Sequence, residues 1–114
     1  MVRGRSSRWF EAMRRAVAYT IGDHDFAAFG QPTVGESTTR SMHRADVIAD
    51  GSMIAIELQA NGFLYRMVRR IVGTLIPIGR SEQSPEDFDR ILKSIDPTQP
   101  KANFVNYLYF FHHY

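Results

Sequence analysis

The stretch that decides the fold is residues 60–75, which have the sequence ANGFLYRMVRRIVGTL. Asn61-Gly62 is a typical break between elements, and the residues after it change to a helical periodicity. The apolar residues at helical spacing are Leu64, Met67, Val68, Ile71, Val72 and Leu75. This spacing predicts an amphipathic helix from about Phe63 to Gly79, with one apolar face against a core.

Three arginines form a second stripe on that predicted helix. Arg66, Arg69 and Arg70 follow the i, i+3, i+4 spacing, and Gly73 continues it. Their guanidinium groups repel one another unless solvent or anions meet them. Such a stripe is ordinarily a solvated face, whereas its functional interpretation is bidentate contact with phosphate or carboxylate. From the residues alone both interpretations stay open, and Arg14 and Arg15 are candidates to extend the same basic surface.

Upstream, the sequence predicts a basic arm at residues 1–8 and one domain at residues 9–114. Apolar residues at helical spacing predict a helix from Trp9 to about Ile21, and Gly22 is the expected C-terminal glycine. Residues 23–40 are rich in Gly, Pro, Ser and Thr, and they predict a long loop. A loop of this length in a small domain is usually functional or packed over something.

A β-hairpin is predicted between this loop and the helix. The alternating apolar residues are Ala45, Val47 and Ala49 before the turn, and Ile54, Ile56 and Leu58 after it. Asp50-Gly51 between the two runs is a strong short-turn signal.

A second helix is predicted to start at Ser84-Pro85-Glu86-Asp87. Serine caps free amides, proline suits the first helical position, and acids favour the positive end of the helix dipole. Phe104–Phe111 has the aromatic composition of a last strand. The whole order predicts an α+β fold, an antiparallel sheet with helices packed on one face.

Composition narrows the class of protein. Hydrophobic residues make up 44% of the 114, enough for a packed core, and the formal net charge is +2. The sequence has no cysteine, which excludes disulfides and thiolate metal sites and favours a cytoplasmic location. It contains neither an apolar run of membrane-spanning length nor the apolar stretch of a signal peptide at its start, so we expect no membrane partner.

Other candidate chemistries are weaker. The four histidines do not match a metal-site spacing, so no metal is expected. His24-Asp25 lacks an adjacent nucleophile, and side chains at 23–25 are expected to cap local backbone instead. The aromatic residues Phe26, Phe29, Phe63 and Tyr65 are candidates to stack on bases. Core packing is the default for phenylalanine, and Tyr65 is expected to be the most open of the four.

Residues 60–75 closely resemble the signature helix of the tRNA pseudouridine synthase A family. Gly22–Phe29, with sequence GDHDFAAF, resembles a second family segment at the right distance upstream. Further matches are Gly30-Gln31-Pro32, Ser37–Arg40 and Ile78-Gly79-Arg80. The resemblance covers about residues 9–98.

The resemblance implies that the chain is half of a two-part fold, the C-terminal half, in an enzyme that converts uridines of the tRNA anticodon stem-loop to pseudouridine without metal or organic cofactor. Family members use an aspartate within a Gly-Arg-Thr-Asp-Ala-Gly motif as nucleophile, and this sequence does not contain the motif. Asp23 and Asp25 belong to a different family segment. The chain alone is therefore expected to be inactive.

By the same resemblance, Arg69 matches the arginine that pairs with the catalytic aspartate. Arg66 and Arg70 match neighbouring family positions and are assigned to RNA or structural contact. From the residues themselves, Tyr65, Arg14 and Arg15 are further candidates for RNA contact. The implied partners are tRNA and either the N-terminal catalytic half or a second copy of a homodimer. Three origins of the chain remain open: it is a fragment of the enzyme, one subunit of a split enzyme, or the product of a broken gene. The alternative function is a non-catalytic RNA-binding or assembly module derived from the family. The aromatic C-terminus departs from the family pattern after Pro97-Thr98-Gln99-Pro100.

Overall fold

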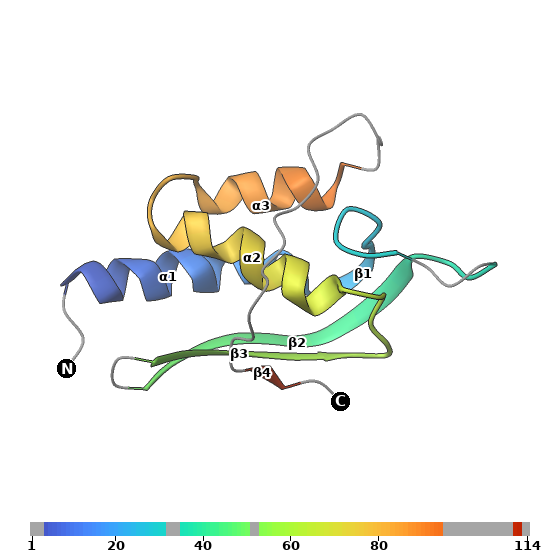
Figure 1. Ribbon diagram of the computed structural model, residues 1–114, viewed down its shortest axis with the longest axis horizontal. Coiled ribbons are helices and arrows are strands. Elements are labelled where there is room, and N and C mark those ends of the chain that lie inside the picture. The colour runs from blue at the N-terminus through green and yellow to red at the C-terminus, as the bar shows by residue number, and fades with distance from the viewer. Residues whose placement is uncertain (1–3, 32–34, 51–52, 95–110, 113–114) are drawn as a thin grey trace.

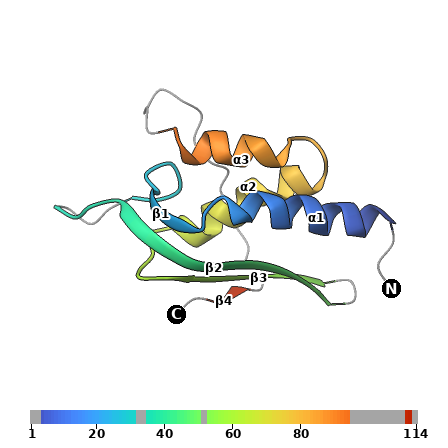
Figure 2. The same ribbon diagram turned by 180° about the vertical axis from the view of Figure 1, so that it is seen from behind.

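The structure is a computed structural model that describes residues 4–31, 35–50, 53–94 and 111–112. Its elements in chain order are α1 (Gly4–Ala18), β1 (Gly22–Asp25), β2 (Thr39–Asp50), β3 (Met53–Ala60), α2 (Met67–Gly79), α3 (Pro85–Leu92) and β4 (Phe111–His112). The helices lie on one face of the sheet (Figures 1 and 2). The predicted α+β class is confirmed. Within the described ranges, every helix is too short or too polar to cross a membrane.

The sheet has the strand order β1-β2-β3-β4. The first three strands are antiparallel, and β4 pairs in parallel with β3. The predicted hairpin is confirmed, because β2 and β3 pair from Met42↔Ala60 to Asp50↔Met53, with one irregularity near Arg44. The predicted turn at Gly51 itself lies outside the described residues. Val47 and Ile56 are cross-strand neighbours, and both side chains are buried on the face that the helices cover. Side chains alternate between the two faces of a strand, so the residues next to Val47 in β2 point to the opposite face.

One core joins the sheet to all three helices. Its buried residues include Ala16 and Val17 of α1, Ile56 and Leu58 of β3, Ile71 and Leu75 of α2, and Phe88 and Leu92 of α3. Phe29 stacks on Phe88 with ring centroids 5.0 Å apart. The segment after β1 is therefore packed into the core, which explains how a small domain accommodates it.

Several predicted boundaries were wrong. The helix predicted from Trp9 to Ile21 runs from Gly4 to Ala18, so part of the predicted arm at 1–8 is helical; residues 5–8 contain no glycine or proline to interrupt it. The predicted loop at 23–40 begins with β1, whose residues 22–25 pair with residues 39–42 of β2. The last strand was predicted at Phe104–Phe111. Only Phe111 of that range is described, in β4, and the rest lies outside the described residues.

The predicted start of α3 is confirmed in detail. The Asp87 amide donates to Ser84 Oγ at 3.3 Å, and the Ser84 amide donates to Asp87 Oδ2 at 2.9 Å, which is a capping box. Pro85 occupies the first helical position. The Ser84 backbone donor and the neighbouring Arg90 guanidinium lower the pKa of the Asp87 carboxyl below its ordinary value.

Candidate nucleic-acid interface

The segment between β3 and α2 is attached to the sheet at its beginning. The Asn61 amide donates to the Ser41 carbonyl at 3.0 Å, and the Ser41 amide donates to Asn61 Oδ1 at 2.9 Å. These reciprocal bonds continue the β2–β3 ladder by one residue. They fix where residues 62–66 leave the sheet.

A second attachment joins this segment to the chain after β1. Gln31 and Tyr65 form an antiparallel bridge, with two backbone hydrogen bonds of 3.3 Å. The close approach requires glycine at position 30, because a Cβ there would lie 2.5 Å from Leu64 Cβ. Leu64 is buried, whereas the next side chain, Tyr65, is 64% exposed. The bridge therefore presents the Tyr65 ring to the outside, as predicted for the most open aromatic residue.

The helix predicted from Phe63 starts four residues later than expected, at Met67. Arg66 is the N-cap residue, with φ 65° in the left-handed region, so the helix does not extend through it. Arg66 therefore does not lie on a helical stripe with Arg69 and Arg70, which corrects the prediction. Its guanidinium carbon is 4.9 Å from the centroid of the Tyr65 ring, a cation–π contact at the surface.

Positive charge is concentrated at the start of α2. Arg69 and Arg70 lie in its first turn, where both are half-buried, and that turn has no acidic residue. The unpaired amides of a helix N-terminus already give it a partial positive charge. The first turn of α2 therefore favours a neighbouring anion.

The other two predicted contact residues, Arg14 and Arg15, lie on α1 and have carboxylate partners. Arg14 forms an ion pair with Glu11 at 3.0 Å, and Arg15 forms one with Glu86 at 2.7 Å. Both pairs are exposed and join α1 to itself or to α3. Exposed ion pairs of this kind contribute little to the free energy of unfolding, and their side chains exchange partners readily.

The polar side chains of β1 have the local role that was predicted. Asp25 Oδ1 accepts from the Ala27 amide at 3.0 Å and from Thr38 Oγ1 at 2.5 Å. The Ser41 hydroxyl donates to Asp23 Oδ1 at 2.5 Å, and the His24 ring lies 2.8 Å from the Ile21 carbonyl oxygen. These bonds hold β1 and the chain after it against β2. Among the described residues, no three His, Asp or Glu side chains come together as a metal site.

The candidate aromatic residues divide into two groups. Phe26 and Phe29 are fully buried in the core, so the base-stacking interpretation is wrong for them. Phe63 is half-buried and Tyr65 is exposed. Phe63 packs against the edge of the core, so Tyr65 is the exposed aromatic residue beside Arg66.

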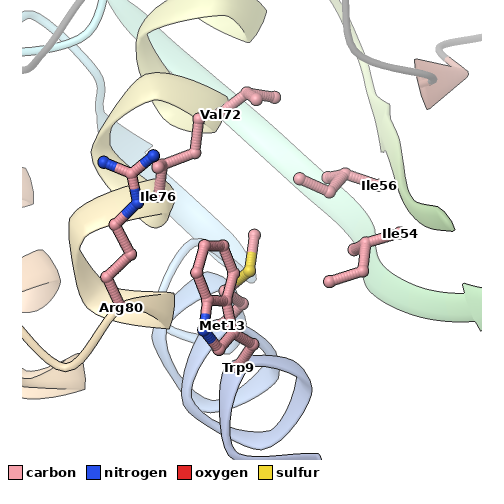
Figure 3. Close-up of a pocket in the computed structure, with 7 residues that line it drawn as sticks. All are labelled: Trp9, Met13, Ile54, Ile56, Val72, Ile76 and Arg80. Atoms are coloured by element: carbon pink, nitrogen blue, oxygen red, sulfur yellow. The ribbon is translucent and has the colours of Figure 1, made fainter. Parts of the chain in front are cut away.

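One pocket lies along the later part of α2, and another lies beside the segment before that helix. One, of about 140 Å³, lies between α1, β3 and α2 and is lined by Trp9, Met13, Ile54, Ile56, Val72, Ile76 and Arg80 (Figure 3). Its walls are apolar apart from Arg80, whose guanidinium lies 5.9 Å from the Trp9 ring centroid. The other is open and polar, and Glu36, Ser37, Arg40, Asn61, Gly62 and Phe63 line it. The predictions did not include Arg40, although it belongs to the Ser37–Arg40 run before the hairpin.

Comparison with known proteins identifies the family. A family described as tRNA pseudouridine synthase matches residues 16–112. The chain is 41% identical over 90 residues to tRNA pseudouridine synthase A of Geobacter sp. strain M21, and the match covers 78% of this chain and 36% of that protein. It is 42% identical over 95 residues to the protein of the same name from Geobacillus kaustophilus, covering 78% and 37%. The chain thus spans little more than a third of the length of these relatives. With residues 16–112 matched, the chain belongs to the tRNA pseudouridine synthase family.

Proposed function

We propose that this chain is part of an enzyme that isomerises uridine to pseudouridine in the tRNA anticodon stem-loop, and that its Arg69 pairs with the catalytic aspartate. The family membership supports the reaction. The single observation that supports the role of Arg69 is the family signature at residues 60–75, folded as an anchored segment that turns into α2 with Arg69 in the first turn. The aspartate would come from a family Gly-Arg-Thr-Asp-Ala-Gly segment, in the same protein or in a second polypeptide.

The chemistry explains why an arginine is useful at this position. A cation beside a carboxylate favours the ionised form, so the aspartate stays nucleophilic at neutral pH. Its planar fork also orients the carboxylate through two parallel hydrogen bonds. After attack the glycosidic bond breaks, and the uracil rejoins the ribose through C5. The uridine must first leave the base stack, because its reacting atoms are shielded there.

The remaining residues are proposed to hold the tRNA. The exposed Tyr65 ring, with the Arg66 guanidinium over it, offers a surface on which a base can stack. Arg70 would meet a phosphate. Arg14 and Arg15 would join this surface by exchanging their exposed carboxylate partners for RNA phosphates. The proposal includes a cytoplasmic location, no organic cofactor, and a catalytic half or a second family copy as protein partner.

Tritium release from tRNA labelled with [5-³H]uridine tests the reaction. Each conversion replaces the C5–H bond with a C5–C1′ bond, so one tritium leaves for every pseudouridine formed. We expect release when the chain is mixed with a polypeptide that contains the Gly-Arg-Thr-Asp-Ala-Gly segment, and none from the chain alone.

The second candidate function is a non-catalytic RNA-binding module. It is favoured by the exposed Tyr65 ring with the Arg66 guanidinium beside it, because these side chains can contact RNA without a catalytic aspartate. It predicts tRNA binding without tritium release from any mixture. That result would reject the proposed reaction while retaining the binding surface.

A further inference from the structure

The polar pocket beside the signature segment is built around one arginine. Arg40 Nη1 donates to the carbonyl oxygens of Ser37 and Thr39, at 2.8 and 2.7 Å. The Arg40 side chain is only 18% exposed. These two hydrogen bonds fix the position of the guanidinium group. Because both acceptors are neutral carbonyl oxygens, they do not balance its positive charge.

The acidic residue nearest this charge is Glu36. Its Oε2 lies 3.9 Å from Arg40 Nη2, beyond hydrogen-bond distance, and its side chain is 59% exposed. A weak ion pair with an exposed side chain is easily displaced. An anion that binds more tightly than the Glu36 carboxylate would therefore occupy the position next to Arg40 Nη2.

The rest of the pocket adds hydrogen-bond donors. Because the Ser41 amide is a donor, only the oxygen of the Asn61 side chain can face it, which leaves the Asn61 Nδ2 group as a donor at the pocket wall. Gly62 packs on the Arg40 side chain, since a Cβ there would be 3.4 Å from Nε. The Ser37 hydroxyl, which accepts from the Thr39 amide, keeps its own proton to donate.

We propose that this pocket binds one phosphate of the RNA backbone, with Arg40 Nη2 and Asn61 Nδ2 as donors and Glu36 as the group that the phosphate displaces. The inference deepens the proposed function, on which its RNA ligand rests. The pocket is lined by residues 61–63, which lead within two residues to Tyr65. A phosphate held here would place an adjoining nucleotide toward Tyr65 and the start of α2. A pocket of about 390 Å³ has room for a phosphate and part of its sugar.

Binding of inorganic phosphate to the ¹⁵N-labelled chain tests the pocket without relying on RNA. At constant ionic strength, phosphate should shift the amide resonances of Ser37 and Gly62. Glu36→Gln removes the competing carboxylate and should tighten phosphate binding roughly fivefold, the effect of one charge at about 4 Å in water. Glu82→Gln is the matched control, because Glu82 is also exposed and the substitution changes the net charge equally. It should leave the affinity unchanged.

The variant Arg40→Met should abolish the phosphate shifts. If it fails to fold, the comparison between the two glutamate variants still decides. Equal effects of Glu36→Gln and Glu82→Gln, or shifts confined to other residues, would overturn the inference. Binding of tRNA that is insensitive to Glu36→Gln would overturn it while leaving the proposed function intact. Phosphate binding at the pocket without tRNA binding would retain the anion site and reject RNA as its ligand, and the tritium-release assay tests the proposed function separately.

Discussion

At the start of α3, the Ser84 side chain caps the helix, and the Asp87 carboxylate accepts a hydrogen bond from the Ser84 amide. Two acidic residues lie in the first turn of this helix. At the start of α2, the N-cap residue is an arginine with φ 65°, its side chain does not cap the helix, and the first turn has two arginines and no acid. The first arrangement caps free amides and places negative charge at the positive end of the helix dipole, whereas the second places positive charge there. Departure from local rules is expected where a surface serves a ligand rather than stability. The α2 start also lies in residues 60–75, the stretch that resembles the family signature.

The largest expected effect is at Arg69. In the reconstituted enzyme, Arg69→Ala should lower the rate of tritium release by about 100-fold or more, as for other positioned groups that stabilise charge in an active site. Arg69→Lys should recover part of it, because it restores the charge without the bidentate geometry. Lys93→Ala, which removes a charge at the far end of α3, is the control and should keep the full rate. A similar loss in Lys93→Ala would mean that the effect is not specific to α2.

Gly30→Ala tests whether the contact of Gly30 with Leu64 stabilises the chain before α2. The new Cβ would lie 2.5 Å from Leu64 Cβ, so the bridge between Gln31 and Tyr65 must move. We expect a loss of about 1–3 kcal/mol in the free energy of unfolding, typical of overpacking. Urea denaturation measures this loss, and an unchanged midpoint would show that the contact is not tight.

Ser84→Ala tests the α3 start. Removing the cap should cost about 1 kcal/mol of unfolding free energy. The change should leave tritium release in the reconstituted enzyme unaltered. Loss of activity at unchanged stability would mean that α3 takes part in function as well.

Arg66→Gly separates stability from function at the α2 start. Glycine adopts the left-handed backbone conformation without the penalty of a side chain, so the unfolding free energy should change by about 1 kcal/mol or less, in the stabilising direction. The same variant should bind tRNA more weakly, since the cation over Tyr65 is lost. Destabilisation instead of a gain would show that the Arg66 side chain supports the fold.

The smallest effect concerns pH. The pKa of Asp87 is lowered in the folded state by the Ser84 amide and by Arg90. The stabilisation is therefore fully present above the ordinary carboxyl pKa and disappears as the pH falls through the lowered folded value. The difference in unfolding midpoint between the wild type and Asp87→Asn should shrink on acidification below about pH 4. A constant difference would indicate that the aspartate does not act through its charge.

These two helix starts also show what sequence alone could predict. The α3 start followed from Ser84-Pro85-Glu86-Asp87, because each capping partner is a neighbour in the chain. The α2 start was misplaced because the left-handed turn at Arg66 accompanies contacts with Gly30 and Gln31, which lie more than thirty residues away. β1 was missed for the same reason, since residues 22–25 have no alternating apolar pattern and are a strand only by pairing with β2. The role proposed for Arg69 comes from the family resemblance, whereas the proposal for Arg40 needed the structure, which places it beside Asn61 and Gly62.

The salt dependence of tRNA binding tests the role of the α2 start most directly. The affinity of the wild-type chain should fall as salt is raised, and Arg66→Ala combined with Arg70→Ala should weaken binding and reduce the slope of log affinity against log salt by about 1–2. The paired control, Arg90→Ala combined with Lys93→Ala, removes the same charge from α3 and should leave the slope unchanged. Equal slopes for the two double variants, or no binding of tRNA at low salt, would show that the arginines at the start of α2 do not form an RNA interface.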